Sequence, residues 1–262
     1  MKTSPGTILK LGSITIVVVS LGFLIVRQKP NEPPFQGKPL SYWLAQLDMK
    51  SARDGTNEAA AAVRSMGTNA LPRLTQMLLT DVSDWEWWLR EQRWFPFRWG
   101  GNERIQEQGS FGLACLREQA VPTLERLLTN HTTTPRSAIT LGRMAPVGTT
   151  VLAHGLTNND ANVRLWCAMA LSSVGTWKNE GQHYYQRVAG TARLAVPALV
   201  TRLSDSNTAV ATTAARALGN LREMPDIVPP ALVSASTNSA LDPVVRASAS
   251  VALRKFQQGG SR

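Results

Sequence analysis

Three segments in the second half of the chain align with one another without gaps, and this repeat limits the fold more than any other feature. They read VRLWCAMALSSV from Val163, VATTAARALGNL from Val210 and VRASASVALRKF from Val245. In each, apolar or small residues fall at positions i, i+3, i+4, i+7, i+8 and i+11, the spacing of a helix that buries one face. The stripes are Val163, Trp166, Cys167, Ala170, Leu171 and Val174; Val210, Thr213, Ala214, Ala217, Leu218 and Leu221; and Val245, Ser248, Ala249, Ala252, Leu253 and Phe256. We predict three equivalent helices, whose small central residues let neighbouring helices approach closely.

A second recurring pattern places a proline close to the start of an apolar helix. It reads ALPRLTQML from Ala70, AVPTLERLL from Ala120, AVPALVTRL from Ala195 and PALV from Pro230. Proline suits the first turn of a helix, where its missing N–H group costs no hydrogen bond. The predicted unit is therefore helix A, which carries the stripe, then a turn, then helix B, which starts at the proline pattern. Further copies begin at EAAAAVRSMG and, in degenerate form, at residues 136–156.

The spacing of these units predicts how they assemble. Val210 and Val245 are 35 residues apart, and Val163 and Val210 are 47 apart because of a polar insert around TWKNEGQHYYQRV. One pair of helices cannot bury its own stripe, so pairs of this period stack into a solenoid. We predict an all-α fold, an α-solenoid of about five or six helical pairs.

The repeat resembles a known family. The pattern D-x-x-V-R-x-x-A-x-x-A-L, followed by A-V-P-x-L-x-x-L-L, resembles HEAT repeats. The matching stretches are Ala161 to Leu203, Ala209 to Val233 and Pro243 to Phe256. The stretch FQGKPLSYWLAQL from Phe35 is similar to the segment that opens the solenoid in bacterial membrane-anchored HEAT repeat proteins. Ala211 departs from the pattern by replacing its arginine. The resemblance implies a scaffold for protein partners, although the family also includes enzymes and nucleic-acid binders.

A run of sixteen uncharged residues, LGSITIVVVSLGFLIV from Leu11, lies near the N-terminus. As a helix it covers about 24 Å, and a start at Thr7 extends it to about the 30 Å thickness of a bilayer core. A cleaved signal peptide is the alternative, but the apolar run is long and no small-x-small cleavage site follows it. We predict a tail at residues 1–6, a transmembrane anchor at 7–27, a linker at 28–36 and the solenoid at 37–262.

The orientation of this anchor depends on the charges that flank it. Lys2 and Lys10 on one side are nearly balanced by Arg27 and Lys29 on the other. N-terminal anchors of this kind most often leave their short end in the cytoplasm. We therefore expect a single-pass membrane protein whose solenoid lies on the extracytoplasmic side.

The stretch DWEWWLREQRWFPFRWG, Asp84 to Gly100, holds five of the eight tryptophans of the chain. It belongs to a predicted insertion at residues 80–108. Five tryptophans present on the order of 1,000 Å² of aromatic surface, more than a monomer usually exposes. Packing onto the solenoid, a protein partner, the membrane interface and base or sugar stacking are alternative ways to cover it. The candidate residues for contact with a partner or membrane are Trp85, Trp87, Trp88, Arg90, Arg93, Trp94 and Trp99.

The net charge of +10 favours an anionic partner, although the arginines are scattered and form no basic run. Arg73, Arg126 and Arg202 recur at related positions of the helix B pattern. We expect them to contact a partner on a concave surface formed by the B helices.

The sequence carries no pattern that specifies catalysis. Cys115 and Cys167 are isolated, as are the three histidines, and no nucleophile elbow, phosphate-binding glycine loop or HExxH motif occurs. We predict a scaffold for a protein partner, with no catalytic residue, cofactor, metal or small-molecule substrate, and do not expect nucleic acid. Two alternatives stay open: a solenoid enzyme of the lyase or DNA-glycosylase type, and a peripheral binder of anionic lipid that uses the tryptophan-rich segment.

Overall fold

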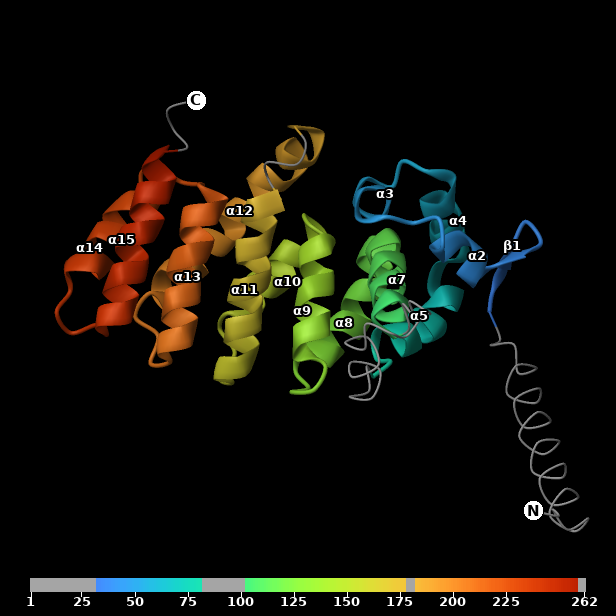
Figure 1. The fold of residues 1–262 in the computed structure, drawn as a ribbon, viewed down its shortest axis with the longest axis horizontal. Helices are drawn as coiled ribbons and strands as arrows, with labels where there is room; N and C mark the ends of the chain where they lie inside the picture. Colours follow the sequence, from blue (N-terminus) through green and yellow to red (C-terminus); the bar gives the residue numbers. More distant parts are fainter. Residues whose placement is uncertain (1–31, 82–101, 178–181, 259–262) are drawn as a thin grey trace, which may run out of the picture.

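The computed structural model describes residues 32–81, 102–177 and 182–258. In these ranges the chain is mostly helical, and its helices stand side by side in an elongated stack (Figure 1). The predicted all-α solenoid is confirmed at this level. The elements are β1 (Pro34–Phe35), β2 (Lys38–Pro39), α2 (Leu40–Leu44), α3 (Met49–Asp54), α4 (Glu58–Met66), η1 (Gly67–Ala70), α5 (Leu71–Leu78), α7 (Asn102–Leu116), η2 (Arg117–Ala120), α8 (Val121–Leu128), α9 (Thr134–Arg143), α10 (Val147–Gly155), α11 (Ala161–Trp177), α12 (Gln182–Arg202), α13 (Thr208–Leu221), α14 (Val228–Thr237) and α15 (Pro243–Gln258).

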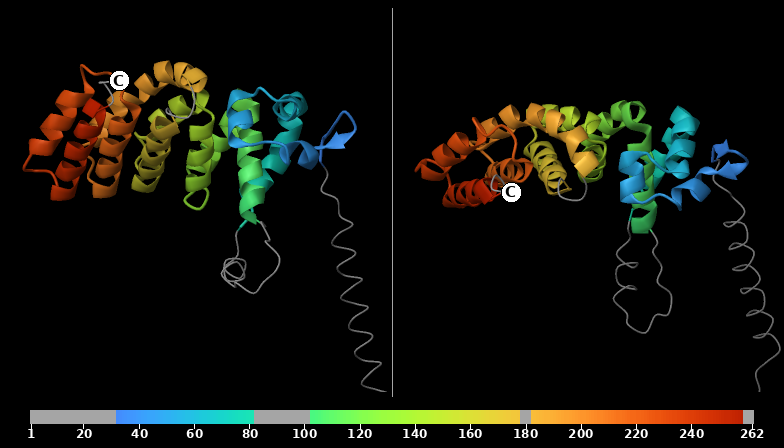
Figure 2. Two further views of the ribbon diagram at one scale, coloured as in Figure 1. Left: turned by 45° about the horizontal axis from the view of Figure 1, so that its top comes forward. Right: turned by 90° about the horizontal axis from the view of Figure 1, so that it is seen from above.

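The helices form two layers that follow one curve. Helices α7, α9, α11, α13 and α15 succeed one another in the first layer, and α5, α8, α10, α12 and α14 make up the second. Helices of the two layers also pack together, as α14 does against α15 and α8 against α9. In the right-hand view of Figure 2 the first layer lies on the inner side of the curve and the second layer on the outer side. We call the solvent-facing side of the first layer the inner surface.

This arrangement corrects the expectation that the B helices line the concave side. The first layer holds the A helices, including α11, α13 and α15. These helices approach one another closely because small residues separate them: a Cβ added to Gly219 would lie 2.9 Å from the Cα of Ala252. The layer with the closer spacing occupies the shorter arc, which is the inner one.

The core runs along the whole stack between the two layers. Val163, Val210 and Val245, which start the three aligned stripes, are 2%, 0% and 3% exposed. Each buried valine or leucine of this kind contributes about 1.5–3 kcal/mol relative to exposure. The predicted stripes are confirmed as the faces that hold the solenoid together. Trp166, predicted to be part of the core, is half-buried and packs against it.

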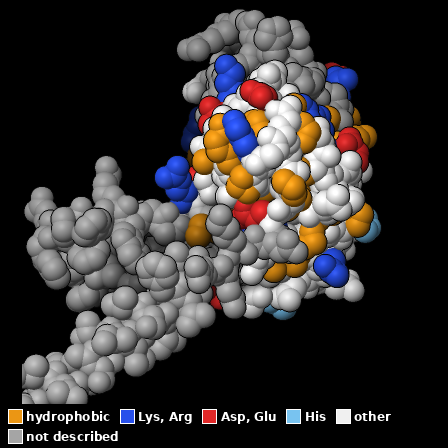
Figure 3. All heavy atoms as spheres, turned by 90° about the vertical axis from the view of Figure 1, so that its right-hand side faces the viewer, with side chains coloured by type: hydrophobic (Ala, Val, Ile, Leu, Met, Phe, Trp, Pro, Cys, Tyr) orange, Lys and Arg blue, Asp and Glu red, His pale blue; other side chains and the backbone are white. Residues whose placement is uncertain are grey.

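The first described residues close the N-terminal end of the stack. Strands β1 and β2 form a two-residue antiparallel hairpin, and α2 follows directly. Trp43 is 2% exposed, its ring meets Phe35 edge-on at 5.9 Å, and its Nε1 donates a hydrogen bond to the Phe35 carbonyl oxygen at 3.4 Å. On the coloured part of this end of the molecule, hydrophobic side chains stand in small groups among charged and neutral ones (Figure 3).

The proline pattern predicts some helix starts correctly and one wrongly. Pro72 and Pro122 lie in the first turns of α5 and α8, as predicted. In contrast, α12 begins at Gln182, so Pro197 lies inside this helix. The polar insert before Pro197 extends the helix in the N-terminal direction.

Among the described residues, no helix has the length and apolar character needed to cross a bilayer. The predicted anchor at residues 7–27 lies outside the described residues. Residues 102–108, which belong to the predicted insertion, form the first turns of α7.

Candidate binding groove on the inner surface

The inner surface is hollowed between α13 and α15. The groove has a volume of about 780 Å³. Val244, Ala247 and Val251 line it from α15, and Thr212 and Arg216 line it from α13. Spacings of three, four and seven residues place these side chains on one face of each helix. We call this feature the valine groove.

The valine groove contains exposed apolar side chains, whereas the solvent-facing side of a helix usually carries polar ones. Val244 is 59% exposed and Val251 is 54% exposed, whereas the adjacent stripe residue Val245 is 3% exposed. In the aligned segments Val251 occupies the position of Arg216, and Ala247 that of Thr212. The same helix face is therefore polar on α13 and apolar on α15.

One end of the groove is cationic and is connected to a hydrogen-bond network through Asn220. Lys255 contacts the side-chain oxygen of Asn220 through its Nζ. Asn220 is buried and donates through Nδ2 to the carbonyl oxygen of Ser172 at 3.1 Å and to its Oγ at 2.8 Å. This network connects α11, α13 and α15. Arg216 is exposed beside it, and none of the described lining residues is acidic.

A second, smaller hollow of about 300 Å³ lies between α7 and α9. Its central cation is Arg143, which donates through Nη1 to Ser110 Oγ at 2.7 Å and lies 3.8 Å from Glu107. The guanidinium also sits 4.9 Å from the Phe111 ring centroid, and Ser110 Oγ lies 3.0 Å from Thr140 Oγ1. Burial lowers the pKa of Arg143, and the charge of Glu107 opposes this shift. We call this feature the arginine pocket.

The three arginines expected to contact a partner lie in the second layer, away from the valine groove. Arg73 on α5 donates to Gln76 Oε1 at 2.8 Å and lies 3.4 Å from Glu32. Arg202, at the end of α12, donates to Asp205 at 3.2 Å. Arg126 on α8 is exposed. The structure does not bring the three together as one contact surface on the inner side.

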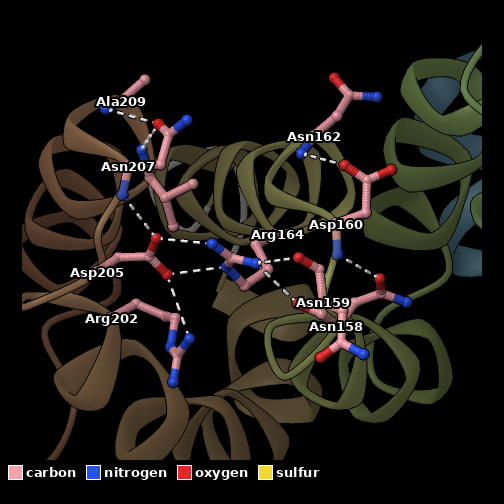
Figure 4. Close-up of polar contacts among 10 residues, drawn as sticks. Asn158, Asn159, Asp160, Asn162, Arg164, Arg202, Asp205, Asn207 and Ala209 are labelled. Atoms are coloured by element: carbon pink, nitrogen blue, oxygen red, sulfur yellow. Dashed lines mark hydrogen bonds and ion pairs between the residues drawn. The ribbon is translucent and has the colours of Figure 1, made fainter.

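Arg202 instead belongs to a polar cluster that joins repeats (Figure 4). Arg164 of α11 donates through Nε and Nη2 to the two carboxylate oxygens of Asp205, both at 2.8 Å. Its Nη1 also donates to the carbonyl oxygens of Asn158 and Asn159, each at 2.9 Å. The Arg164 and Asp205 side chains are 9% and 1% exposed. Such a buried, fully bonded pair is structural, because neither group can reach a ligand.

The two groups of this pair shift each other's pKa in opposite directions. Burial by itself would raise the pKa of Asp205. Hydrogen bonds from Arg164 and from the Asn207 backbone, with the charges of Arg164 and Arg202, outweigh burial and lower it. The hydrogen bond to Asp205 raises the pKa of Arg164 in turn. The pair is therefore ionised throughout the neutral range.

Trp85, Trp87, Trp88, Arg90, Arg93, Trp94 and Trp99 lie outside the described residues. The described chain stops at Asp81 and resumes at Asn102, beside the arginine pocket. There Asn102 Nδ2 donates a hydrogen bond to the Asp81 carbonyl oxygen at 2.5 Å.

The two cysteines are buried core residues. Burial raises the pKa of Cys115 and of Cys167 to about 12. The thiols stay protonated near neutral pH, and a protonated thiol is a poor nucleophile and metal ligand. Within the described ranges, no three potential metal-ligating side chains gather.

The sequence patterns did not single out the residues of the valine groove, although a signal for them exists. Val244 and Val251 lie off the buried stripe of their helix, where a polar residue is expected. Two valines at off-stripe positions seven residues apart fall on one exposed face. Comparing off-stripe positions among the three aligned segments would have found them.

No protein-family model and no curated protein matches the chain. Solved structures similar to it include an engineered protein with 20% identity, covering 84% of this chain and 96% of that one at a TM-score of 0.41. A computationally designed armadillo repeat protein for modular peptide recognition has 15% identity, coverage of 79% and 98%, and a TM-score of 0.42. Another designed armadillo repeat protein, solved in complex with the peptide (KR)4, has 15% identity, coverage of 83% and 98%, and a TM-score of 0.41.

Proposed function

We propose that this protein is a scaffold that binds a partner protein through its inner surface, with the valine groove as the main contact. The observation that carries this proposal is the exposure of Val244 and Val251, both above half, inside one groove of about 780 Å³. Apolar area that leaves water on binding contributes about 25 cal/mol per Å². A protein surface that fills the groove would gain this contribution.

The chemistry of the groove suits recognition. Its described lining offers valines, hydroxyl groups, one amide and two cations. Interfaces combine an apolar centre with a polar rim in this way. General acid–base catalysis needs a titratable acid or base near the reaction pH. The described lining contains no histidine, aspartate or glutamate to fill this role.

We further propose that the scaffold is tethered to a membrane by residues 7–27, with the solenoid on the extracytoplasmic side. The support is the uncharged run from Leu11 to Val26, which approaches the thickness of a bilayer core once Thr7 is taken as the start. The tether would keep the groove near the bilayer and restrict its partners to those that reach this surface. Alkali extraction of membranes and protease protection of the solenoid would test both parts.

The binding proposal is tested by site-specific photo-crosslinking in the intact, membrane-embedded protein. A photoreactive residue replaces Val251 in one variant and Val233 in the control. Val233 is 46% exposed but lies on α14, outside the groove. We expect a discrete protein adduct from position 251 and none from position 233. Adducts of equal yield from both positions, or from neither, would contradict the proposal.

A further inference from the structure

We propose that the partner segment that occupies the valine groove is acidic and amphipathic. Its apolar side chains would face Val244 and Val251, and its carboxylates would face Arg216 and Lys255. This inference rests on the proposed function and adds the chemistry of the partner to it.

The first support is the charge of the groove. Several other arginines in the described ranges face acids of their own chain, as Arg143 faces Glu107, Arg164 faces Asp205 and Arg193 faces Glu223. In contrast, both charged residues of the groove lining, Arg216 and Lys255, are cations. A carboxylate placed between them would supply the missing negative charge, and the net charge of +10 would attract an acidic segment at long range.

The second support is the order of the side chains along the groove. In the aligned segments Arg216 stands level with Val251, and Asn220 stands level with Lys255. The groove is therefore apolar from Val244 onward and becomes cationic toward the C-terminal ends of α13 and α15. A bound segment would need its apolar residues beside Val244 and its carboxylates at the end that lies beside Lys255.

The length of the groove limits the size of the segment. Val244 and Lys255 are eleven residues apart on α15, which corresponds to about 16 Å along the helix axis. About eleven residues of a partner helix, or about five extended residues, span this distance. A short linear segment of a partner is therefore sufficient.

The shape of the site favours a peptide over other anions. A bilayer surface is flat on this scale, whereas the groove lies on the inner side of a curved stack. Double-stranded nucleic acid is held by many cations that neutralise successive phosphates, and the described lining offers two. A groove with apolar and cationic parts matches an amphipathic segment better than it matches a bilayer or a nucleic-acid duplex.

The test is a selection from a phage-displayed library of random twelve-residue peptides on the detergent-solubilised full chain. We expect the enriched peptides to combine apolar residues with aspartate or glutamate near one end. Their affinity for the Arg216→Glu/Lys255→Glu double variant should fall about tenfold, and should also fall as salt is raised. Selection on the double variant should enrich lysine and arginine in place of the acids.

Two matched controls separate local effects from general ones. Arg254→Glu reverses one positive charge, where the double variant reverses two, at an exposed position of α15 that does not line the groove. Val233→Ser makes the same apolar-to-polar change as Val251→Ser, but on α14. Both controls should keep wild-type affinity, and Val251→Ser should weaken binding several-fold. Thermal unfolding of each variant confirms that it is folded.

The outcomes distinguish this inference from the proposed function. Peptides that need Val251 but show no acidic preference would overturn the acidic partner and leave the protein-binding groove standing. Peptides that bind Val251→Ser and the double variant as well as wild type would overturn both. Binding of anionic phospholipid vesicles that is lost in the double variant but kept in Arg254→Glu would replace the acidic peptide with a lipid surface.

Discussion

The arginine pocket and the valine groove lie on the same surface, yet they use their polar residues in opposite ways. At the α7/α9 end, Arg143 is half-buried and contacts Ser110, Glu107 and the Phe111 ring. At the α13/α15 end, Arg216 is exposed and lines the larger valine groove together with the exposed Val244 and Val251. The inner surface is therefore divided between an end whose polar side chains join helices and an end whose valines stay exposed.

The α7/α9 end and the α13/α15 end belong to one stack, and the Arg164–Asp205 pair lies between them. Asp205→Ala should lower the free energy of unfolding by about 3–5 kcal/mol, because it leaves the buried Arg164 cation without its partner. Urea unfolding monitored by circular dichroism gives this value. Glu103→Ala on α7 is the control for loss of a less buried carboxylate. A loss below about 1 kcal/mol for Asp205→Ala would mean that the pair does not join the two ends.

Low pH should weaken the Arg164–Asp205 ion pair in the unsubstituted protein. The folded-state pKa of Asp205 is lowered below its unfolded value, which is about 3.9. A group with a depressed folded pKa stabilises fully above the unfolded pKa and loses that stability as pH falls through the folded pKa. We expect the free energy of unfolding to fall below about pH 4 and to fall less steeply in Asp205→Asn. Parallel pH curves for the two proteins would assign acid unfolding to other groups.

The width of the valine groove should depend on Gly219, which allows α13 and α15 to touch. Gly219→Ala should destabilise by about 1–3 kcal/mol through overpacking against Ala252, and should alter peptide binding. At the other end of the inner layer, a Cβ added to Gly142 would lie 3.4 Å from the Ala170 oxygen. Gly142→Ala should therefore change stability by less than about 1 kcal/mol, because helix propensity offsets the tighter contact. Equal losses for both variants would remove the distinction between the two contacts.

The smallest expected difference in stability is that between Arg143→Ala in the arginine pocket and Arg216→Ala in the valine groove. Arg143→Ala should cost about 1–2 kcal/mol of stability, since it removes a charged hydrogen bond and a contact with the Phe111 ring. Arg216→Ala should cost less than about 0.5 kcal/mol, as expected for an exposed side chain. Thermal and urea unfolding under the same conditions measure both. If Arg216→Ala proved the more destabilising change, the groove cation would have a structural role.

Much of the architecture can be predicted from residue spacing, and the limits of that prediction are physical. The stripes that start at Val163, Val210 and Val245 identify the buried faces because burial repeats with the helical period. Periodicity does not say which layer is inner, since helices of both layers bury one stripe. The small residues near Gly219 carry that information, because the layer whose helices approach most closely takes the inner arc.

The candidate site was harder to predict because it depends on positions outside the repeated stripe. Arg73, Arg126 and Arg202 recur in sequence, but recurrence in the second layer places them on the outer side or in internal contacts such as that of Arg202 with Asp205. The valine at position 251 does not recur in the repeat, because Arg216 occupies the equivalent position on α13. A partner surface is built from the differences between repeats, whereas alignment finds what they share.

Met169, Arg216 and Val251 occupy one equivalent position on α11, α13 and α15, which are neighbours in the first layer, and each lies off the buried stripe. None of the three belongs to the buried hydrophobic core. The protein could therefore acquire a new binding preference one helix at a time, with little cost in foldability, and the three positions form a natural starting set for laboratory evolution of altered specificity.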